Sequence, residues 1–462
     1  MSSEYAYIGM NRFGLGADNK SVNTLNANSD LPVVQSWLIN QLSEYKLPAY
    51  KWTSNKAMRS HVELRKQRDN TGNNESKQQA YTKTRRAFIN EVRQMAEQTA
   101  VHNLNHLQPM QARLLDFFSN HFSVSRNNLP MTMLAPTLEA EAIGPNLHMR
   151  FSDILVAVTK HPAMLIYLNN EASIGPNSNL GKKRKGKKAR SGLNENLSRE
   201  ILELHTLGVN GGYTQADVTE LAKAITGWSV ASVRRGEEPG FVFRAQAHEL
   251  GDRFILGKKY KQMPLRERVQ TGYLVLKDLA KQKATAKHLS TKLVRHFIAD
   301  SPPMTIVNAM VEKWLNTDGH IPSVMGAMIM HKDSWNKNQN KYKTPREFVV
   351  SSMRAFNVKK SAPRLYQTLE LMGQGFFNSG SPAGYADVED AWLSTSALNT
   401  RIEWASHFAS FLAKRKQLDP VSAAKTALGP FLTSATLNAI KRAESKEMAL
   451  AVMLLSPEFQ RR

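Results

Sequence analysis

The chain has 462 residues, 41% of them hydrophobic, which is enough to bury a large core and excludes a disordered protein. Its 62 Lys and Arg residues outnumber 39 Asp and Glu residues, and the formal charge of +23 favours an anionic partner such as nucleic acid, a lipid surface or an acidic glycan. The lack of cysteine excludes disulfides and thiolate metal sites, and no apolar run reaches the roughly 18 residues of a membrane-spanning helix.

Apolar residues recur at helical spacing along most of the chain, which predicts a mainly α protein, a multi-helix globular bundle with a small β-hairpin insertion. We expect a main helical domain over residues 1–357 and a C-terminal helical region over 358–462 packed on it. The first residues lack a basic segment followed by an apolar core, so no signal peptide is visible. The polar residues 66–80 indicate a mobile loop or a solvated helix end.

Two histidine patterns occur in the first third of the chain. His102 and His106 have the four-residue spacing of zinc-binding helices, but the Glu of the zincin motif is missing. Asn120 and His121 follow the phenylalanines of a helix that Pro109 opens. His121 is a candidate catalytic residue and Asn120 a candidate ligand-binding one, although a lone histidine on such a helix is more often a hydrogen-bonded core residue.

A dense basic run lies near the middle of the chain. Seven of the nine residues 182–190 are Lys or Arg, and their mutual repulsion predicts a flexible loop. The loop could bind phosphate or sulfate groups of a polyanion, or only aid solubility. It lacks the interleaved aromatic residues that stack on bases, which counts against specific single-strand recognition. The candidate polyanion-binding residues are Lys182, Lys183, Arg184, Lys185, Lys187, Lys188 and Arg190.

The stretch 191–230 predicts two helices joined by a glycine turn. Asn194 or Ser191 can cap the first helix, and Gly208 lies where a left-handed residue would end it. Thr214 and Asp217 then have the spacing of a capping box for the second helix.

The polar face of the first of these helices has two interpretations. Its charges can simply be solvated, with Glu195 and Arg199 as an i,i+4 ion pair. If other helices cover the face, it forms a pocket in which Glu200 or Glu203 acts as acid or base and Arg199 holds an anionic group. Asn194 and Asn196 are then candidate ligand-binding residues.

Further candidates follow the central stretch. Two short β-like runs, 241–243 and 254–256, predict a hairpin within 240–260 that projects His248, a candidate catalytic residue, and Asp252, a candidate ligand-binding one. Lys292, another ligand-binding candidate, shares a helix face with His296. Tyr385 and Trp392 are expected to rim a pocket. The sequence identifies no cofactor, and a divalent metal stays open without a ligand motif to support it.

Seven segments stand out along the chain: Asn11–Gly16, Phe117–Phe122, His161–Leu165, Asn194–Val218, Ala284–Pro303, Gly373–Tyr385 and Ser456–Arg462. Together they resemble the bacterial domain of unknown function 1800 family. The resemblance implies a mainly helical protein, periplasmic or secreted, with relatives that often carry export signals and are encoded beside a sulfatase-like partner. It implies no reaction, but it adds weight to His121 and places a histidine in the region of His248.

Three functions follow from these patterns. The first is an envelope-associated or exported protein that binds an anionic polymer or a partner protein through its basic surface. The second is a hydrolase or lyase, metal-assisted or not, that uses Glu200 or Glu203 with His121 or His248 and Arg199. The third is non-specific binding of nucleic acid, which rests on charge alone.

Overall fold

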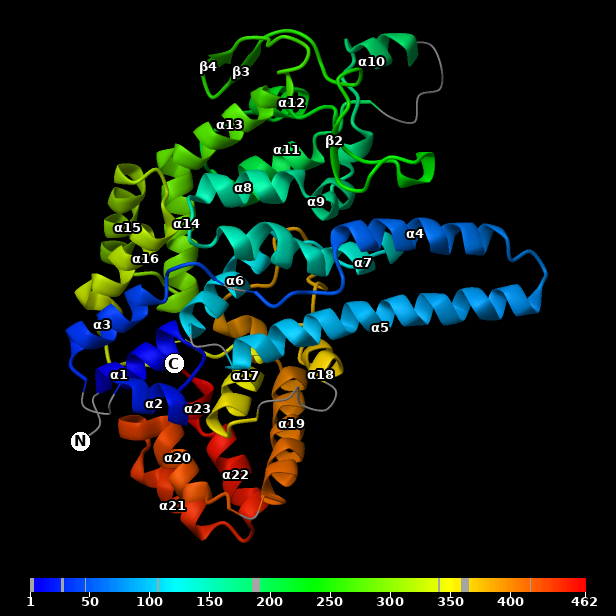
Figure 1. Cartoon of the computed structure of the whole chain (residues 1–462). Helices are drawn as coiled ribbons and strands as arrows, with labels where there is room; N and C mark the ends of the chain where they lie inside the picture. The colour runs from blue at the N-terminus through cyan, green and yellow to red at the C-terminus, as the bar shows by residue number, and fades with distance from the viewer. Residues whose placement is uncertain are drawn as a thin grey trace.

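The computed structural model describes residues 4–25, 29–45, 47–105, 108–184, 192–339, 341–358, 365–415 and 417–462. These residues form 23 α-helices and two antiparallel two-stranded sheets, which confirms the predicted mainly α fold with a small β insertion (Figure 1). None of the helices in these ranges is both long and apolar enough to cross a membrane.

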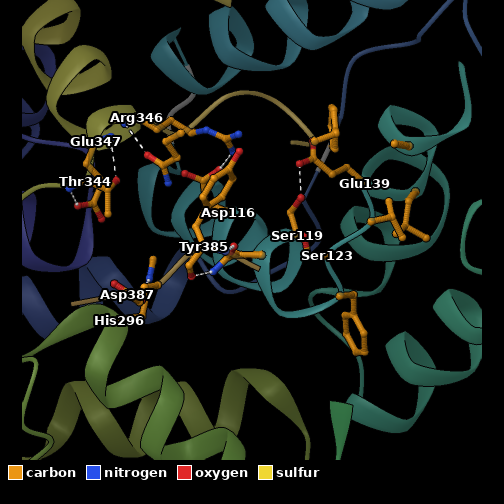
Figure 2. A pocket seen from close by; sticks show the side chains of 18 residues that line it. Asp116, Ser119, Ser123, Glu139, His296, Thr344, Arg346, Glu347, Tyr385 and Asp387 are labelled. Carbon is orange, nitrogen blue, oxygen red and sulfur yellow. Dashed lines mark hydrogen bonds and ion pairs between the residues drawn. The ribbon is translucent and has the colours of Figure 1, made fainter. Parts of the chain in front are cut away.

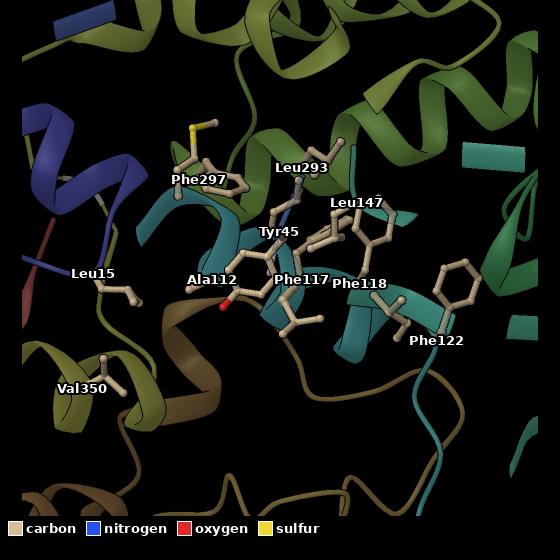
Figure 3. Packing of buried hydrophobic residues seen from close by; sticks show 14 of the residues in the cluster. Leu15, Tyr45, Ala112, Phe117, Phe118, Phe122, Leu147, Leu293, Phe297 and Val350 are labelled. Carbon is tan, nitrogen blue, oxygen red and sulfur yellow. The ribbon is translucent and has the colours of Figure 1, made fainter. Parts of the chain in front are cut away.

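The core is built around α6 (Pro109–His121), which begins at a proline and is buried on nearly every side. Phe118, Phe122 and Phe151 stack on one another with ring centroids 6.1–6.3 Å apart. Figure 3 shows Phe118 and Phe122 of this cluster among the other buried side chains around α6. The helices around them are α7 (Leu129–Leu138) with its π-helical continuation η2 (Glu139–Ile143), η3 (Gly144–Asn146), α8 (Phe151–Lys160), α9 (Pro162–Tyr167) and η4 (Asn170–Ala172).

A long helical hairpin extends from this core, made of α4 (Ser54–Asp69) and α5 (Glu75–Asn105). Thr53 caps α4 by accepting from the backbone N–H of Lys56. Figure 1 shows the far ends of both helices reaching beyond the rest of the molecule. The polar segment 66–80 is the exposed tip of this hairpin, so of the two alternatives the solvated helix end is the one observed.

The predicted helix pair forms above the core. Its first helix is α11 (Asn196–Glu200) with the π-helical turn η5 (Ile201–His205), and Gly208 follows with a φ of +86°. Its second helix is α12 (Gln215–Ala224), for which Thr214 and Asp217 form the predicted capping box. The neighbouring helices are α10 (Asn179–Arg184) and α13 (Val269–Lys281).

The predicted pairing of the β-like runs is wrong. β2 (Phe241–Phe243) pairs with β1 (Trp228–Val230), and η6 (Val233–Arg235) lies in the connection between them. β3 (Arg253–Ile255) pairs instead with β4 (Lys258–Tyr260). Leu256 and Gly257 connect β3 to β4 and have φ values of +50° and +74°. This two-residue turn pairs β3 with the strand that directly follows it, and not with β2.

The remaining helices enclose the core from two sides. On one side lie α14 (Lys283–Phe297), α15 (Met304–Asn316), α16 (Ile321–Met330) and η7 (Lys332–Trp335), beside α3 (Leu31–Asn40), α1 (Glu4–Ile8), η1 (Gly9–Phe13) and α2 (Asn19–Leu25). Below them lie α17 (Pro345–Ala355), α18 (Leu365–Leu371), η8 (Glu389–Trp392), α19 (Thr395–Ala413), α20 (Pro420–Leu428), η9 (Gly429–Phe431), α21 (Ser434–Arg442), α22 (Lys446–Leu455) and α23 (Pro457–Gln460).

The C-terminal helices return to the core. Phe348 of α17 packs edge-on against Trp404 of α19, with ring centroids 5.3 Å apart. The backbone N–H of Arg462 donates to the carbonyl of Lys341, and that of Lys341 donates back to Arg462. The last residue of the chain thus reaches the segment that leads into α17.

Candidate functional site

The polar face of α11 and η5 is partly covered by α12. Arg199 lies between Glu195 and Glu203, 3.6 and 3.3 Å away, and its side chain is 40% exposed against 30% and 26% for the two carboxylates. Its guanidinium also donates to Oε1 of Gln215 on α12. Burial raises the pKa of Glu200. Arg199 and its two carboxylate partners therefore form half-buried i,i+4 ion pairs along one helix, and the hydrogen bond to Gln215 links them to α12.

The two asparagines of this stretch differ in exposure. Oδ1 of Asn194 accepts from the backbone N–H of Asn196, and its Nδ2 donates to the carbonyl of Asn169. Asn196 is exposed at the start of α11. Ser191, the alternative cap, lies outside the described residues.

His121 is buried at the end of α6 and meets one other candidate, Lys292. Its Nδ1 lies 3.0 Å from Nζ of Lys292, and its Nε2 lies 3.1 Å from the carbonyl oxygen of His205. The rings of Phe117 and His121 stack with centroids 5.9 Å apart. Burial and the charge of Lys292 hold the pKa of His121 well below its ordinary value. The neighbouring ammonium is itself desolvated, which lowers the pKa of Lys292 to about 8.

His248 and Asp252 belong to the β region. Nδ1 of His248 lies 2.8 Å from the carbonyl of Thr226, while Asp252 pairs with Lys259 at 2.8 Å. In the described part of the chain, no hydrogen bond or ion pair joins either residue to α11.

The basic run is described only at its start. Lys182 and Lys183 are exposed on α10, which ends at Arg184. Lys185, Lys187, Lys188 and Arg190 lie outside the described residues, and so does His106.

A polar pocket lies at the base of α6, and we call it the central pocket. Residues of α6, η2, α14, α17 and the loop 374–387 line it. Figure 2 shows their side chains converging from these separate segments. The polar groups include Asp116, Ser119, Asn120, Glu139, His296, Arg346, Tyr385 and Asp387.

One side of the central pocket carries two carboxyl groups. Asp116 forms an ion pair with Arg346, and the hydroxyl of Ser119 donates to Glu139. Burial raises the pKa of Glu139, against the opposing effects of Arg346 and Ser119. Glu139 therefore retains a proton to higher pH than an ordinary glutamate.

The other side carries an imidazole oriented by a carboxylate. Nδ1 of His296 lies 2.7 Å from Oδ2 of Asp387, and Lys341 lies 3.0 Å from Oδ1 of the same aspartate. These neighbours hold the pKa of Asp387 well below its usual range despite burial. Asp387 is consequently ionised and accepts a hydrogen bond from Nδ1–H of His296, which leaves the ring's lone pair on Nε2. That atom is buried and has no hydrogen-bond partner among the described residues.

Buried ion pairs support the wall of the pocket. Glu347 binds Arg113 at 2.9 Å and Arg462 at 2.8 Å. Burial opposes ionisation, but the two guanidinium groups outweigh it and lower the pKa of Glu347 to about 2. The chain end and α6 are thus fixed to the start of α17.

Asn120 holds the loop that closes the pocket. Its Nδ2 donates to the carbonyl of Tyr385 at 2.9 Å, and its Oδ1 accepts from the N–H of Tyr385 at 2.7 Å. Tyr385 lines the pocket, with the ring of Trp392 6.3 Å away.

The spacing of residues in the sequence did not predict this pocket, but the segments that carry the family resemblance point to it. Three of the segments that carry the family resemblance, Phe117–Phe122, Ala284–Pro303 and Gly373–Tyr385, contribute lining residues. The pocket could have been sought where such segments meet, although the sequence alone does not show that they meet. Within the described residues, no three His, Asp or Glu side chains are grouped as a metal site.

The second notable feature is the charge of the far half of the α4–α5 hairpin. Residues 65–87, which we call the basic arm, contain seven basic and two acidic residues. All seven basic side chains are exposed, and among described residues the one ion pair they form is that of Arg68 with Asp69. They are Arg65, Lys66, Arg68, Lys77, Lys83, Arg85 and Arg86.

Fold and site together define a mainly helical protein with a polar central pocket and a projecting basic arm. The chain belongs to the family described as "Protein of unknown function (DUF1800)", whose model matches residues 9–461. Searches among curated proteins and among solved structures found no match to the chain.

Proposed function

We propose that the protein binds an anionic polymer and that the basic arm is its main binding surface. The observation that carries the proposal is the exposure of seven cations on one projecting hairpin with two acidic residues among them. By the family resemblance, the polymer would belong to the cell envelope or lie outside the cell.

The geometry of the arm suits a polymer better than a small ligand. The part of α5 that belongs to the arm, residues 75–87, is about 20 Å long at the rise of an α-helix, and α4 lies beside it with three more of the cations. Cations on such a rod can contact successive phosphate, sulfate or carboxylate groups along a chain. Each contact releases counterions, so we expect binding to weaken steeply with salt.

The basic run 182–190 is the alternative surface for the same function. Its first two lysines are exposed on α10, in a different part of the molecule from the arm (Figure 1). The contributions of the two surfaces to binding can be distinguished by removing positive charges from each surface in a separate variant.

The test compares three variants of the full chain that each lose four positive charges. The arm variant carries Arg65→Gln, Lys66→Gln, Lys83→Gln and Arg86→Gln, and the run variant carries Lys182→Gln, Lys183→Gln, Lys187→Gln and Lys188→Gln. The control variant carries Lys414→Gln, Lys425→Gln, Lys441→Gln and Arg442→Gln, all exposed on the C-terminal helices. Glutamine is a good helix former, so each fold should survive.

Binding to heparin, polyphosphate and duplex DNA is measured by fluorescence anisotropy over a salt series. We expect the arm variant to lose roughly tenfold or more in heparin affinity, with a shallower salt dependence, while the control stays near the unmodified chain. Equal losses of heparin affinity in the arm and control variants would show that only the net charge of the protein matters, and would refute the proposal. A loss confined to the run variant would move the site to residues 182–190, and a preference for duplex DNA would favour nucleic-acid binding.

A further inference from the structure

The central pocket is close to electrically neutral, in contrast to the charge of the whole chain. Asp116 is paired with Arg346, Glu347 lies between Arg113 and Arg462, and Lys341 lies between Asp387 and Asp300, so four cations face four carboxylates. Glu139 is the carboxyl group left over, and burial favours its uncharged form. The carboxylates would therefore repel an anionic ligand, and their existing ion pairs leave little attraction for a cationic one.

The pocket nevertheless contains a polar atom that lacks a partner. Within the described residues, Nε2 of His296 is buried without a hydrogen bond, although a buried polar atom of this kind usually has one. Because Asp387 fixes the proton on Nδ1, Nε2 is an acceptor, and it has no donor in this part of the chain. A hydroxyl group supplies such a donor without adding charge.

The other lining groups are compatible with the same chemistry. The ring of Phe377 is partly exposed and provides apolar surface, and the hydroxyls of Ser123 and Thr344 also line the pocket. Pockets of mixed apolar surface and a few oriented polar groups are typical of small-ligand sites.

We propose that the central pocket binds a small neutral compound that carries hydroxyl groups, a polyol or a sugar residue, and that one hydroxyl donates to Nε2 of His296. Asp387 is a positioning residue in this site, because it sets which nitrogen of the imidazole accepts. The site is independent of polymer binding by the basic arm, which lies on a different part of the chain.

The test uses three compounds with one ring and different charge: glucose, glucosamine and glucuronate. Saturation-transfer NMR and calorimetry measure their binding to the full chain, to His296→Phe and to His407→Phe. The phenylalanine keeps a ring at position 296 but removes the acceptor, while His407 is exposed and serves as the matched control. We expect glucose to bind best, to bind the control equally, and to bind His296→Phe at least about tenfold more weakly, the equivalent of about 1.4 kcal/mol.

A second measurement needs no variant at the site. The ¹⁵N resonance of Nε2 of His296 should be that of an unprotonated nitrogen and should shift when glucose is added. The proposal is overturned if glucose does not bind, if a charged analogue binds more tightly, or if His296→Phe binds glucose as well as the unmodified chain does. Should His296→Phe fail to fold, a ¹⁵N resonance that stays unmoved at saturating glucose also overturns it.

Discussion

The ammonium of Lys292 lies 3.0 Å from Nδ1 of His121, and this contact fixes the protonation of the histidine. A charged ammonium has donors only, so Nδ1 of His121 must be the acceptor and the proton must sit on Nε2. That nitrogen then donates to the carbonyl of His205, 3.1 Å away. His121 is therefore a neutral imidazole held between a donor and an acceptor.

Neutral histidines around this contact make the protein sensitive to acid. Burial lowers the pKa of His205 to about 3 and that of His288 to about 4, both below the value near 6.5 of an unfolded chain. Below about pH 6.5 the unfolded chain binds protons that the folded one does not, so the free energy of unfolding falls as the pH falls. Each such histidine contributes up to about 1.4 kcal/mol per pH unit until its folded pKa is reached.

The variant His288→Gln tests this contribution. Glutamine keeps a donor for the carbonyl of Leu204, 3.1 Å from Nε2 in the unmodified chain, but does not titrate. Urea unfolding between pH 4 and 7 should give a shallower loss of stability for His288→Gln than for the unmodified chain. His407→Gln, at an exposed site, should leave the slope unchanged. Parallel curves for all three proteins would contradict the assignment.

Local signals in the sequence predicted helix ends well. Thr214 and Asp217 form the predicted box, and Asp30 caps α3 by accepting from the N–H of Val33. These contacts involve residues three apart, so the sequence determines them almost alone. The start of α5 at Glu75 could not be predicted in this way, because its exposed first turns lack the apolar period that marks a helix.

The central pocket could not be predicted in the same way. Asp116 meets Arg346, and His296 meets Asp387, across 230 and 91 residues of chain. Only the packing of α6, α14 and α17 brings these partners together. His296 was singled out from its helix face and Tyr385 as a pocket rim, but nothing in the spacing joined them. The strand pairing was wrong for a related reason: the sequence offered only the run 254–256 as a partner for Phe241–Phe243, whereas tertiary packing pairs it with Trp228–Val230.

Glu347 should be among the residues on which stability depends most. It is buried between Arg113 and Arg462, which are also buried. Glu347→Gln leaves two guanidinium groups without a counter-charge, and the expected cost is about 3–5 kcal/mol of unfolding free energy at pH 7. Asp69→Asn breaks the exposed pair with Arg68 and should cost about 0.5 kcal/mol or less. Similar urea midpoints for the two variants would show that the buried network is not required.

The hydrogen bonds between Asn120 and Tyr385 should depend on Gly384, the loop residue that precedes Tyr385 and lies against the backbone of α6. Gly384 has a φ of +80°, and a Cβ there would lie 2.4 Å from the backbone oxygen of Asn120. Gly380 has a φ of +74°, but in the described part of the chain nothing lies within 4 Å of its Cβ position. Both alanine variants incur the strain of a left-handed backbone, about 1–2 kcal/mol, and Gly384→Ala alone adds the clash.

The comparison of the two alanine variants isolates the clash. Gly384→Ala should lower the thermal midpoint further than Gly380→Ala and should increase amide exchange across residues 378–387. If the two variants unfold together and exchange alike, the loop does not depend on close approach to Asn120.

The basic arm should bind through a rigid surface rather than through charge alone. Leu64 of α4 is 1% exposed where the arm leaves the core, and the ring of Tyr81 on α5 is partly buried on the same hairpin. Leu64→Ala removes this packing without changing any charge, so local opening of the hairpin should become easier. A more flexible arm loses conformational entropy when it is ordered on binding, and this cost weakens its affinity for the polymer.

We expect Leu64→Ala to show faster hydrogen exchange over residues 61–87 and a measurable loss of heparin affinity. Leu371→Ala, at an exposed position, should change neither. Faster exchange with unchanged affinity would mean that the cations act without a fixed geometry, and the arm would then be an electrostatic tether instead of a shaped surface.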